Sequence, residues 1–484
     1  MESTNISYDD FSIRFEPQRR GGYPFSITSP AGHARAKMRV PFSPDQIQAF
    51  REELNHQILW RNVHDVQAVK DFGAQLFDAL FADRQAIRLF ERHRGMVESV
   101  PLRGLRIKLH FSPDIPKLYH ISMLPWEFLY DTEFSTFLGR SADTPVVRYL
   151  NVPRPMHRST QLPGLPKPLS ILAVLSSPKD PVKLRLDKEK AVIEQAMTDL
   201  RRKNLIALDY LVPPTLEKLH QSCSDKSYSA LHFSGHGGFN KNGQPVICFE
   251  HEDGLSHPVS GEDLAAFLQD QRGLQFVFLN ACKTSDVISQ RGIDPFSSMA
   301  AALVSTGVPA VLAMQFPITD PVAIKFSQEV YRKLAEGCLI DTAVANGRKA
   351  IFAWQTTSFE WGTPVLFTHV PDGRLFHVER EPVRPSPLEK EIHNPAASIR
   401  DVIIGRLDAK ELRDFCTSRL GMDYDGLPGR SIVTKAGGLI EYALNHNRLL
   451  ELVQKLREDR PDIAELESIE VSLLTESEEE YAET

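Results

Sequence analysis

The sequence predicts an α/β fold with a mainly parallel sheet flanked by helices, an N-terminal α+β region and a small all-helical C-terminal domain. Three observations support this. Apolar runs alternate with amphipathic helical patterns between about residues 169 and 369, as in parallel sheets. The preceding part mixes strand-like and helical patterns. After about residue 392 the β signals vanish, and apolar residues recur at helical spacing.

Composition limits the class of protein. The 484 residues suggest about two to four domains. With 42% hydrophobic and 25% charged residues, the chain can build real cores, which argues against a disordered or fibrous protein. The net charge is −7, but residues 461–484 hold nine acidic residues and no Lys or Arg, so the rest is close to +2. A nearly neutral body does not predict nucleic acid binding.

The cysteines and the N-terminus predict a cellular compartment. Five scattered cysteines form no disulfide framework and indicate a reducing environment; they are Cys223, Cys248, Cys282, Cys338 and Cys416. The first residues lack the basic and apolar regions of a secretory signal, and no run of about 18 apolar residues predicts a transmembrane helix. We therefore expect a soluble cytoplasmic protein with no membrane partner.

The first half begins with strands around a Gly21-Gly22 turn. A helix should follow, because Ser43 can cap it, Pro44 suits its first position and Gln46 can complete a capping box. The next expected elements are a helix over 66–80 and a strand over 105–111, whose alternating pattern is that of a half-buried strand.

A Pro-rich stretch over 153–168 reads as a linker, and the α/β alternation follows it. Asp320 is expected to cap one of the later helices, with Pro321 at its first position. Strands are expected over 169–175, 205–212, 228–233, 274–279, 308–314 and 364–369, and helices over 188–202, from Thr215, from Ser260, over 295–306 and from Asp320.

A second Pro-rich break, over 379–392, separates the helical segment. Helices are expected there over 402–407, 409–420, 431–445 and 449–459. The predicted organisation is an N-terminal α+β part (1–165), an α/β core (166–378), a linker (379–392), a helical domain (393–462) and an acidic tail (463–484).

Two predicted strand ends carry chemistry. His236 follows one apolar strand and Cys282 follows another, and ligands bind outside the carboxyl ends of parallel strands. Cysteine hydrolysis needs this pair, because a thiolate attacks a carbonyl while an imidazole handles the proton. Gly235, Gly237 and Gly238 allow tight turns, and the N–H groups of Gly237 and Cys282 could form an oxyanion hole.

Other readings of these residues remain open. A lone cysteine after an apolar strand is often a small buried hydrophobe, and His236 could be a loop histidine; the joint pattern is more specific. His232 and His236 are four apart, but Gly235 and the strand context argue against a metal site. We expect no metal and no cofactor, and assign His232 to the core or to a supporting position.

The motifs resemble a known family. Ser234-Gly-His-Gly237 and Leu279-Asn-Ala-Cys282 resemble the CHAT group of caspase-like cysteine peptidases, relatives of separase and the caspases. Leu124-Pro-Trp-Glu-Phe-Leu-Tyr130 and Thr144-Pro-Val-Val-Arg-Tyr149 resemble the N-terminal half of CHAT domains. The resemblance implies a caspase-like fold over about 100–370, with residues 1–165 as its N-terminal part and 166–378 as its catalytic core.

The resemblance also implies site roles. His236 would be the general acid/base and Cys282 the nucleophile, with oxyanion donors at Gly237 and Cys282 and a protein as substrate. In several arginine-cutting relatives an Asp lies two positions before the cysteine, where this chain has Asn280. Asp180 and Asp286 are candidate acidic residues of the specificity pocket, or else solvated loop carboxylates.

The helical segment resembles bacterial effector-associated domains, death-fold-like adaptors that pair with a matching domain on another protein. The stretches that carry this are 412–416, 421–428, 439–442 and 448–452. The resemblance implies recruitment by a sensor or adaptor protein, in bacterial antiphage defence or programmed cell death. The structural alternative is a helical bundle that packs on the peptidase.

The sequence thus predicts a cysteine endopeptidase that cleaves a partner protein on signal. The first rival is a catalytically degenerate adaptor or scaffold that acts through its helical domain. A second is a cysteine hydrolase of small acyl substrates.

Overall fold

The computed structural model describes residues 6–19, 21–58, 65–111, 119–122, 124–152, 162–180, 186–283, 295–377, 395–428, 432–446, 448–461, 463, 466 and 469–470. Contacts divide the chain into two compact units, Met1–Glu379 and Arg380–Thr484. Each unit is described by itself.

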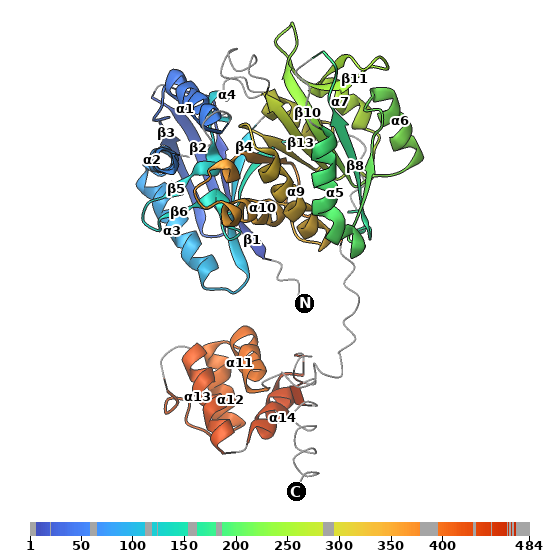
Figure 1. The fold of residues 1–484 in the computed structure, drawn as a ribbon. Helices are drawn as coiled ribbons and strands as arrows, with labels where there is room; N and C mark the ends of the chain where they lie inside the picture. The colour runs from blue at the N-terminus through green and yellow to red at the C-terminus, as the bar shows by residue number, and fades with distance from the viewer. Residues whose placement is uncertain are drawn as a thin grey trace. The chain divides into compact units, whose positions relative to one another are not determined.

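A mixed, mostly parallel sheet forms the centre of the first unit (Figure 1). Its strand order is β12-β11-β10-β13-β14-β15-β7-β4-β1-β2-β3, with β8 and β9 attached through β10. The strands are β1 (Ser7–Phe15), β2 (Tyr23–Ser29), β3 (Gly32–Met38), β4 (Arg103–Phe111), β7 (Val146–Leu150), β8 (Leu169–Ser176), β9 (Ile206–Tyr210), β10 (Ala230–Phe239), β11 (Pro245–Glu250), β12 (Ser256–Ser260), β13 (Phe276–Lys283), β14 (Ala310–Met314) and β15 (Pro364–Thr368); β5 (Tyr130–Asp131) and β6 (Thr136–Phe137) pair separately.

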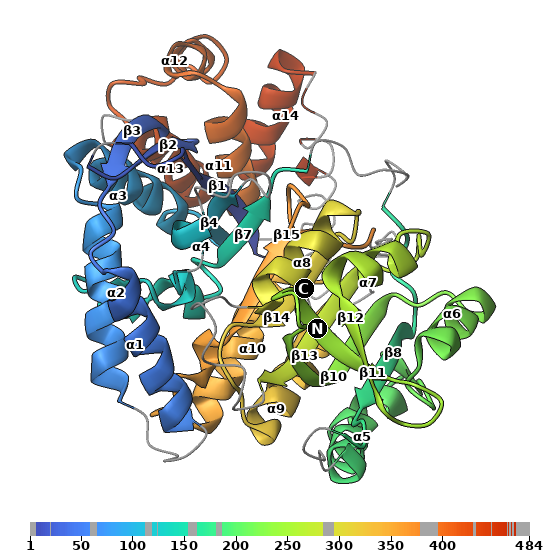
Figure 2. The same ribbon diagram turned by 90° about the horizontal axis from the view of Figure 1, so that it is seen from above.

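Helices flank this sheet on both faces (Figure 2). Near the β10–β13–β14 region, α7 and α8 contribute to one apolar cluster, and α5, α9 and α10 contribute to the other. The helices of this unit are α1 (Pro44–His56), α2 (Val66–Leu80), α3 (Arg84–Glu98), α4 (Tyr119–Ser122), α5 (Leu186–Arg202), α6 (Leu216–Asp225), α7 (Gly261–Leu268), α8 (Pro295–Ser305), α9 (Asp320–Ala335) and α10 (Ile340–Trp354).

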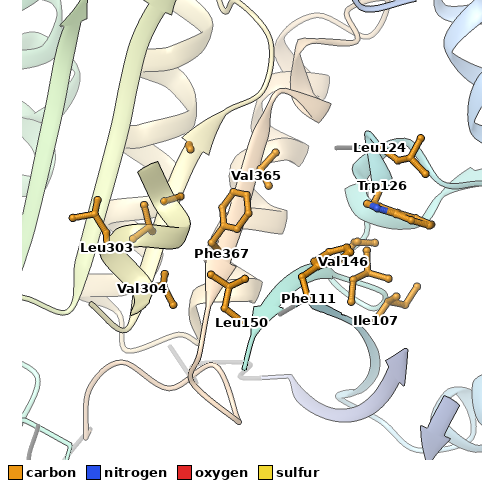
Figure 3. Packing of buried hydrophobic residues seen from close by; sticks show 14 of the residues in the cluster. Ile107, Phe111, Leu124, Trp126, Val146, Leu150, Leu303, Val304, Val365 and Phe367 are labelled. Carbon is orange, nitrogen blue, oxygen red and sulfur yellow. The ribbon is translucent and has the colours of Figure 1, made fainter. Parts of the chain in front are cut away.

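One core runs through both halves of this unit. Figure 3 shows Leu303 of α8 on one side and Ile107 of β4 on the other, with Phe367 of β15 and Leu150 of β7 between them, in one buried cluster. Strand β15 pairs with β14 and with β7, so the backbone ladder is continuous as well. The predicted α/β architecture is therefore confirmed, and its N-terminal part shares the sheet of the remainder.

Local capping signals placed several helices correctly. The capping box of Ser43 and Gln46 is present, and α2 has the predicted bounds. The predicted cap of α9 was wrong: Thr319 is the N-cap and Asp320 lies within the helix. The Thr319 hydroxyl and N–H both donate to the Glu360 carboxylate, which ties this helix start to a later loop that the local sequence does not reveal.

The half-buried character predicted for 105–111 was wrong, because β4 is buried on both faces. Its polar residues are paired inside the protein. Arg106 donates to Asp10 and to Asp341, each at 2.7 Å, and Lys108 donates to Asp10 at 2.5 Å. Buried charges are tolerated where such partners satisfy them. The alternation of polar and apolar residues therefore predicts the wrong burial for this strand.

The second unit is all-helical, as predicted, with α11 (Pro395–Arg406), α12 (Ala409–Ser418), α13 (Ile432–Asn445) and α14 (Leu449–Asp459) around their own apolar core. The loop before α13 is fixed by Lys435, a buried residue. Its Nζ donates to the carbonyls of Tyr424, Asp425 and Leu427 at 3.0, 3.1 and 2.6 Å. In the described parts of both units, we find no helix of the length and apolarity needed to cross a membrane.

Candidate active site

Strands β10 and β13 bring the predicted dyad positions together. They pair in parallel with His236 opposite Cys282 and Ser234 opposite Asn280. Neighbouring strands lie about 4.8 Å apart, so the backbones at 236 and 282 are adjacent although 45 residues of chain separate them. Both positions lie at the carboxyl ends of central strands, where open sheets bind ligands.

His236 is buried, with 3% of its surface exposed. Two residues earlier on the same face, Ser234 is also buried, and His232 lies below it. The His232 ring stacks on Phe278 with centroids 4.5 Å apart, and its Nδ1 lies 2.9 Å from the Tyr331 hydroxyl. Burial lowers the pKa of His232 to about 4, and the ring packs in the core, which is one of the two positions expected for it.

The glycines around His236 do not make the tight turns that were predicted. Strand β10 continues in extended conformation to Phe239, and its glycines have no positive φ. Gly235 is required for another reason: a Cβ there would lie 2.7 Å from the carbonyl oxygen of Ser176 on β8. Close packing of two backbones beside the dyad excludes a side chain at this position.

A hairpin that the sequence patterns did not reveal forms one wall beside His236. Strands β11 and β12 pair antiparallel, and β11 also pairs with the end of β10. The signal was Asp253-Gly254 in the turn between β11 and β12, a common hairpin-turn pair, with Gly254 at φ +78°. Strand β11 has only the short apolar run 246–249 and β12 has none, so this turn was the clearest local signal of the hairpin.

Asp180 lies exposed against this hairpin. It accepts hydrogen bonds from the N–H of Ser256 at 2.7 Å and from its hydroxyl at 2.5 Å. The hydrogen bond from the Ser256 hydroxyl is the largest influence on the Asp180 pKa and lowers it.

Asn280 is the third predicted pocket residue, and it is buried two register pairs below the dyad. Its Nδ2 donates to Ser234 Oγ at 3.4 Å, while its Oδ1 receives no hydrogen bond from the part of the chain that the structure describes. The predicted pocket residue Asp286 lies outside the described residues.

The other cysteines have surroundings that suppress thiolate formation. Burial raises the pKa of Cys223, Cys248 and Cys416 to about 11 each and also raises that of Cys338. Among the described residues, no three His, Cys, Asp or Glu side chains form a group that could hold a metal ion. The rings of His251 and His257 stack on each other, with their centroids 4.1 Å apart.

Comparison with known proteins decides the family. The model of the CHAT domain family matches residues 70–373, which is more than half of the chain. The chain belongs to the CHAT domain family. A second model, effector-associated domain 7, matches residues 399–461 within the helical unit. No curated protein matches the chain.

Solved structures resemble the fold at low identity. Two crystal structures of the Saccharomyces cerevisiae separase–securin complex, at 2.6 and 3.0 Å resolution, share 12% and 14% identity with the chain, with TM-scores of 0.37 and 0.36. Each match covers 75% of this chain and 30% of the other, so the CHAT protein spans under a third of those chains.

The upstream motifs of this CHAT domain build a junction whose role the sequence did not reveal. Glu127 and Arg148, one from each motif, form a buried ion pair at 2.8 Å. Gln315, which follows β14, donates to Glu127 at 2.9 Å and to the Gly362 carbonyl at 2.8 Å. The motifs thus connect the N-terminal part to the strand beside β13.

Proposed function

We propose that this CHAT protein is a caspase-like cysteine endopeptidase that uses His236 and Cys282. The observation that carries the proposal is the register of His236 opposite Cys282 at adjacent parallel strand ends. Two features support it: the His236 surroundings are largely closed to water, and the other described cysteines are held as thiols by burial.

The proposed reaction proceeds through an acyl-enzyme. The Cys282 thiolate attacks the scissile carbonyl, and the N–H groups of Cys282 and Gly237 stabilise the oxyanion. The C–N bond then breaks as the His236 imidazolium gives its proton to the leaving amine. Water attacks the thioester, His236 takes its proton, and the carboxylate product and the free thiolate are released.

The pocket for the substrate side chain before the cut is proposed to include Asn280 in its floor, with Asp180 and Asp286 as candidate acidic residues. Asn280 is buried on the sheet face that carries His236 and has an acceptor oxygen available. Because Asn280 carries no charge, a preference for Arg or Lys before the cut would depend on Asp180 or Asp286 and not on the floor of the pocket.

The helical unit is proposed to recruit the peptidase to a sensor or adaptor protein that carries a matching domain, in the cytoplasm of a bacterium and in antiphage defence or programmed cell death. Its separate core and its match to effector-associated domain 7 support this role. Removal of residues 393–484 should then abolish signal-dependent cleavage in responding cells while Cys282 stays reactive; unchanged cleavage contradicts the recruiting role.

The peptidase proposal is tested by N-terminal proteomics on bacterial cells that express the wild type, Cys282→Ala or Cys248→Ala. Cys248 lies on neighbouring β11 with a raised pKa, so its variant is the matched control. We expect new N-termini with the wild type and with Cys248→Ala, but none with Cys282→Ala. New N-termini that persist in Cys282→Ala would contradict the assignment and favour a scaffold.

A further inference from the structure

Three strands of the N-terminal part have one face in the core and one face turned outward. Phe11, Ile13 and Phe15 of β1 are buried, and α3 packs on their side, with the Phe90 ring centroid 5.5 Å from that of Phe11. The residues that alternate with these on β1, and their neighbours on β2 and β3, are half-buried or exposed. We call this outward surface of β1, β2 and β3 the basic face.

Strand register places the cations of the basic face in a regular array. Arg14 of β1 is opposite Ser26 of β2, and Ser26 is opposite Arg35 of β3, so the two arginines lie on one line across the strands. His33 and Lys37 flank Arg35 along β3, and all four basic side chains are exposed. Alternate residues of a strand are about 6.6 Å apart, so β3 presents a basic side chain at that interval.

The carboxylates on the same side of β1 already have partners. Asp10 accepts from two basic side chains of β4, and Glu16 accepts from Arg19 at 3.1 Å. Within the residues that the structure describes, Arg14 and Arg35 have no ion-pair partner. The basic face therefore keeps positive charge that attracts an anionic partner.

Strand β3 is also an edge strand, which pairs with β2 alone in the described part of the chain. Pro24 of β2 has no N–H and its carbonyl accepts from Glu16 of β1, so the pair of Pro24 with Lys37 is not hydrogen-bonded. Bonded and non-bonded pairs alternate in antiparallel strands, so the pairs of Arg35 and His33 are not bonded to β2 either. The N–H and C=O groups of Arg35 and His33 therefore point to the open edge.

This combination favours a polypeptide over a nucleic acid. An extended segment beside β3 can pair with the open backbone groups, and its alternate side chains then lie on the basic face. A nucleic acid cannot extend the backbone ladder, and the outward residues of β2 and β3 include no Phe, Tyr or Trp ring on which bases could stack. Basic residues on an edge strand also discourage self-pairing, but that role does not need Arg14, two strands from the edge.

We propose that the basic face and the edge of β3 bind an extended acidic segment of a partner protein. The segment adds a strand beside β3 and places carboxylates at every second residue against Arg35 and its neighbours. Strand β3 is seven positions from β13 in the order of the sheet, about 34 Å at the usual strand spacing. The site is therefore distinct from the dyad, and its occupation does not depend on peptidase activity.

The first test measures binding of a fluorescein-labelled peptide of alternating Glu and Thr, about ten residues long, to the full chain by fluorescence anisotropy. The same peptide with Gln in place of Glu is the charge control. We expect saturable binding of the Glu peptide that weakens with salt, and binding of the Gln peptide that is weaker by about tenfold or more. Equal binding of the two peptides overturns the proposal. So does a lack of binding both in the full chain and in a chain that ends at Glu470, in which the acidic tail cannot compete.

Substitutions on the basic face locate the site. Arg35→Gln should weaken binding of the Glu peptide by about two- to fivefold, and the double variant with Arg14→Gln by more. Arg88→Gln, which removes an exposed arginine of α3 on the other side of the sheet, is the matched control and should leave binding unchanged. An equal loss in Arg88→Gln and Arg35→Gln would assign binding to net charge and contradict the site.

Backbone pairing is tested with two further peptides, N-methylated either at the Glu residues or at the Thr residues. In an added strand only one of these two sets of N–H groups faces β3, so one peptide should lose affinity by about tenfold and the other should keep it. Retained affinity in both would show that no strand is added. A labelled oligonucleotide that binds more tightly than the Glu peptide, and that loses affinity in Arg35→Gln, would make the basic face a nucleic acid site and overturn the acidic partner.

Discussion

Arg148 and Glu127 form an ion pair that is almost completely buried, with 1% and 0% of their side chains exposed and 2.8 Å between Nη2 and Oε2. Arg148 also donates to the carbonyls of Ser122 and Leu124 at 2.7 and 3.2 Å, and Glu127 accepts from Gln315. Ser122, Leu124 and Glu127 belong to one short stretch, which is α4 and the turn after it, whereas Arg148 lies on β7 and Gln315 follows β14. The pair therefore organises the junction between the upstream motifs and the strands of the candidate site.

Breaking this pair should destabilise the first unit strongly. Arg148→Met leaves the Glu127 carboxylate buried without its cation, which typically costs about 3–5 kcal/mol. Guanidinium unfolding followed by tryptophan fluorescence measures this, because all four tryptophans precede residue 380. The control is Arg202→Met, which removes an exposed pair with Asp199 and should cost under about 1 kcal/mol. Similar losses of unfolding free energy in the two variants would contradict a larger contribution of the buried Arg148 pair to stability.

Two adjacent glycines of α13 should respond in opposite directions to alanine. A Cβ at Gly438 would lie 2.5 Å from Pro428 Cδ, whereas one at Gly437 would have no atom within 4 Å. Gly438→Ala should therefore destabilise the helical unit by about 1–3 kcal/mol through overpacking. Gly437→Ala should stabilise it by about 0.5–1 kcal/mol through helix propensity.

Hydrogen exchange of α13 amides in the full chain measures both effects. Wild-type exchange is the reference for each variant. Equal protection of α13 in the two variants would mean that the loop at Pro428 does not pack on α13 as described.

His232 should make the first unit less stable as the pH falls. Its pKa is lowered to about 4 by burial, from 6.5 in an unfolded chain, so the unfolded state binds the proton first. The contribution of His232 to the free energy of unfolding is complete above about pH 6.5. It is lost as the pH falls from about 6.5 to 4, and the total loss is about 3 kcal/mol. His232→Gln, which does not titrate, should show a correspondingly flatter stability profile across that window.

Unfolding curves by tryptophan fluorescence between pH 4 and 7 measure the difference. His33→Gln, at an exposed position on β3, is the control and should follow the wild type. A wild-type profile that runs parallel to that of His232→Gln would contradict a buried neutral imidazole at this position.

Local signals in the sequence predicted most elements, while contacts between distant segments decided the rest. The capping residues of α1 and the apolar runs of β8, β10 and β13 act over a few residues, so they can be read directly. The pairing of Thr319 with Glu360, and of Arg106 with Asp341, joins segments 41 and 235 residues apart. No local pattern contains that information.

The candidate site divides in the same way. The alternation predicted a parallel sheet, so positions 236 and 282 were expected at two strand ends of one sheet; that these strands are neighbours, with 236 opposite 282, comes from the structure. The contact of Asp180 with Ser256 depends on the β11–β12 hairpin, whose second strand has no apolar run. The hydrogen-bond partner of Asp180 is therefore visible only in the structure.

The identity of residue 280 should set the charge preference of the pocket. Asn280→Asp places a carboxylate on the sheet face beside Ser234, two register pairs below position 282. A substrate Arg or Lys before the cut would then find an opposite charge in a poorly hydrated site. We expect cleavage after Arg or Lys to gain about tenfold or more over the wild-type preference, which corresponds to about 1.4 kcal/mol.

Competition among peptides that differ only in the residue before the cut, read out by mass spectrometry, measures this ratio. Ser234→Ala is the matched control, since it changes the neighbour of Asn280 without adding charge. Because a buried carboxylate can impair folding, tryptophan fluorescence should first establish that the variant is folded. Asn280→Leu offers a second, uncharged probe and should favour apolar residues. If folded Asn280→Asp and Asn280→Leu both keep the wild-type preference, Asn280 is not part of the pocket floor, and its amide serves only to bridge β13 to Ser234.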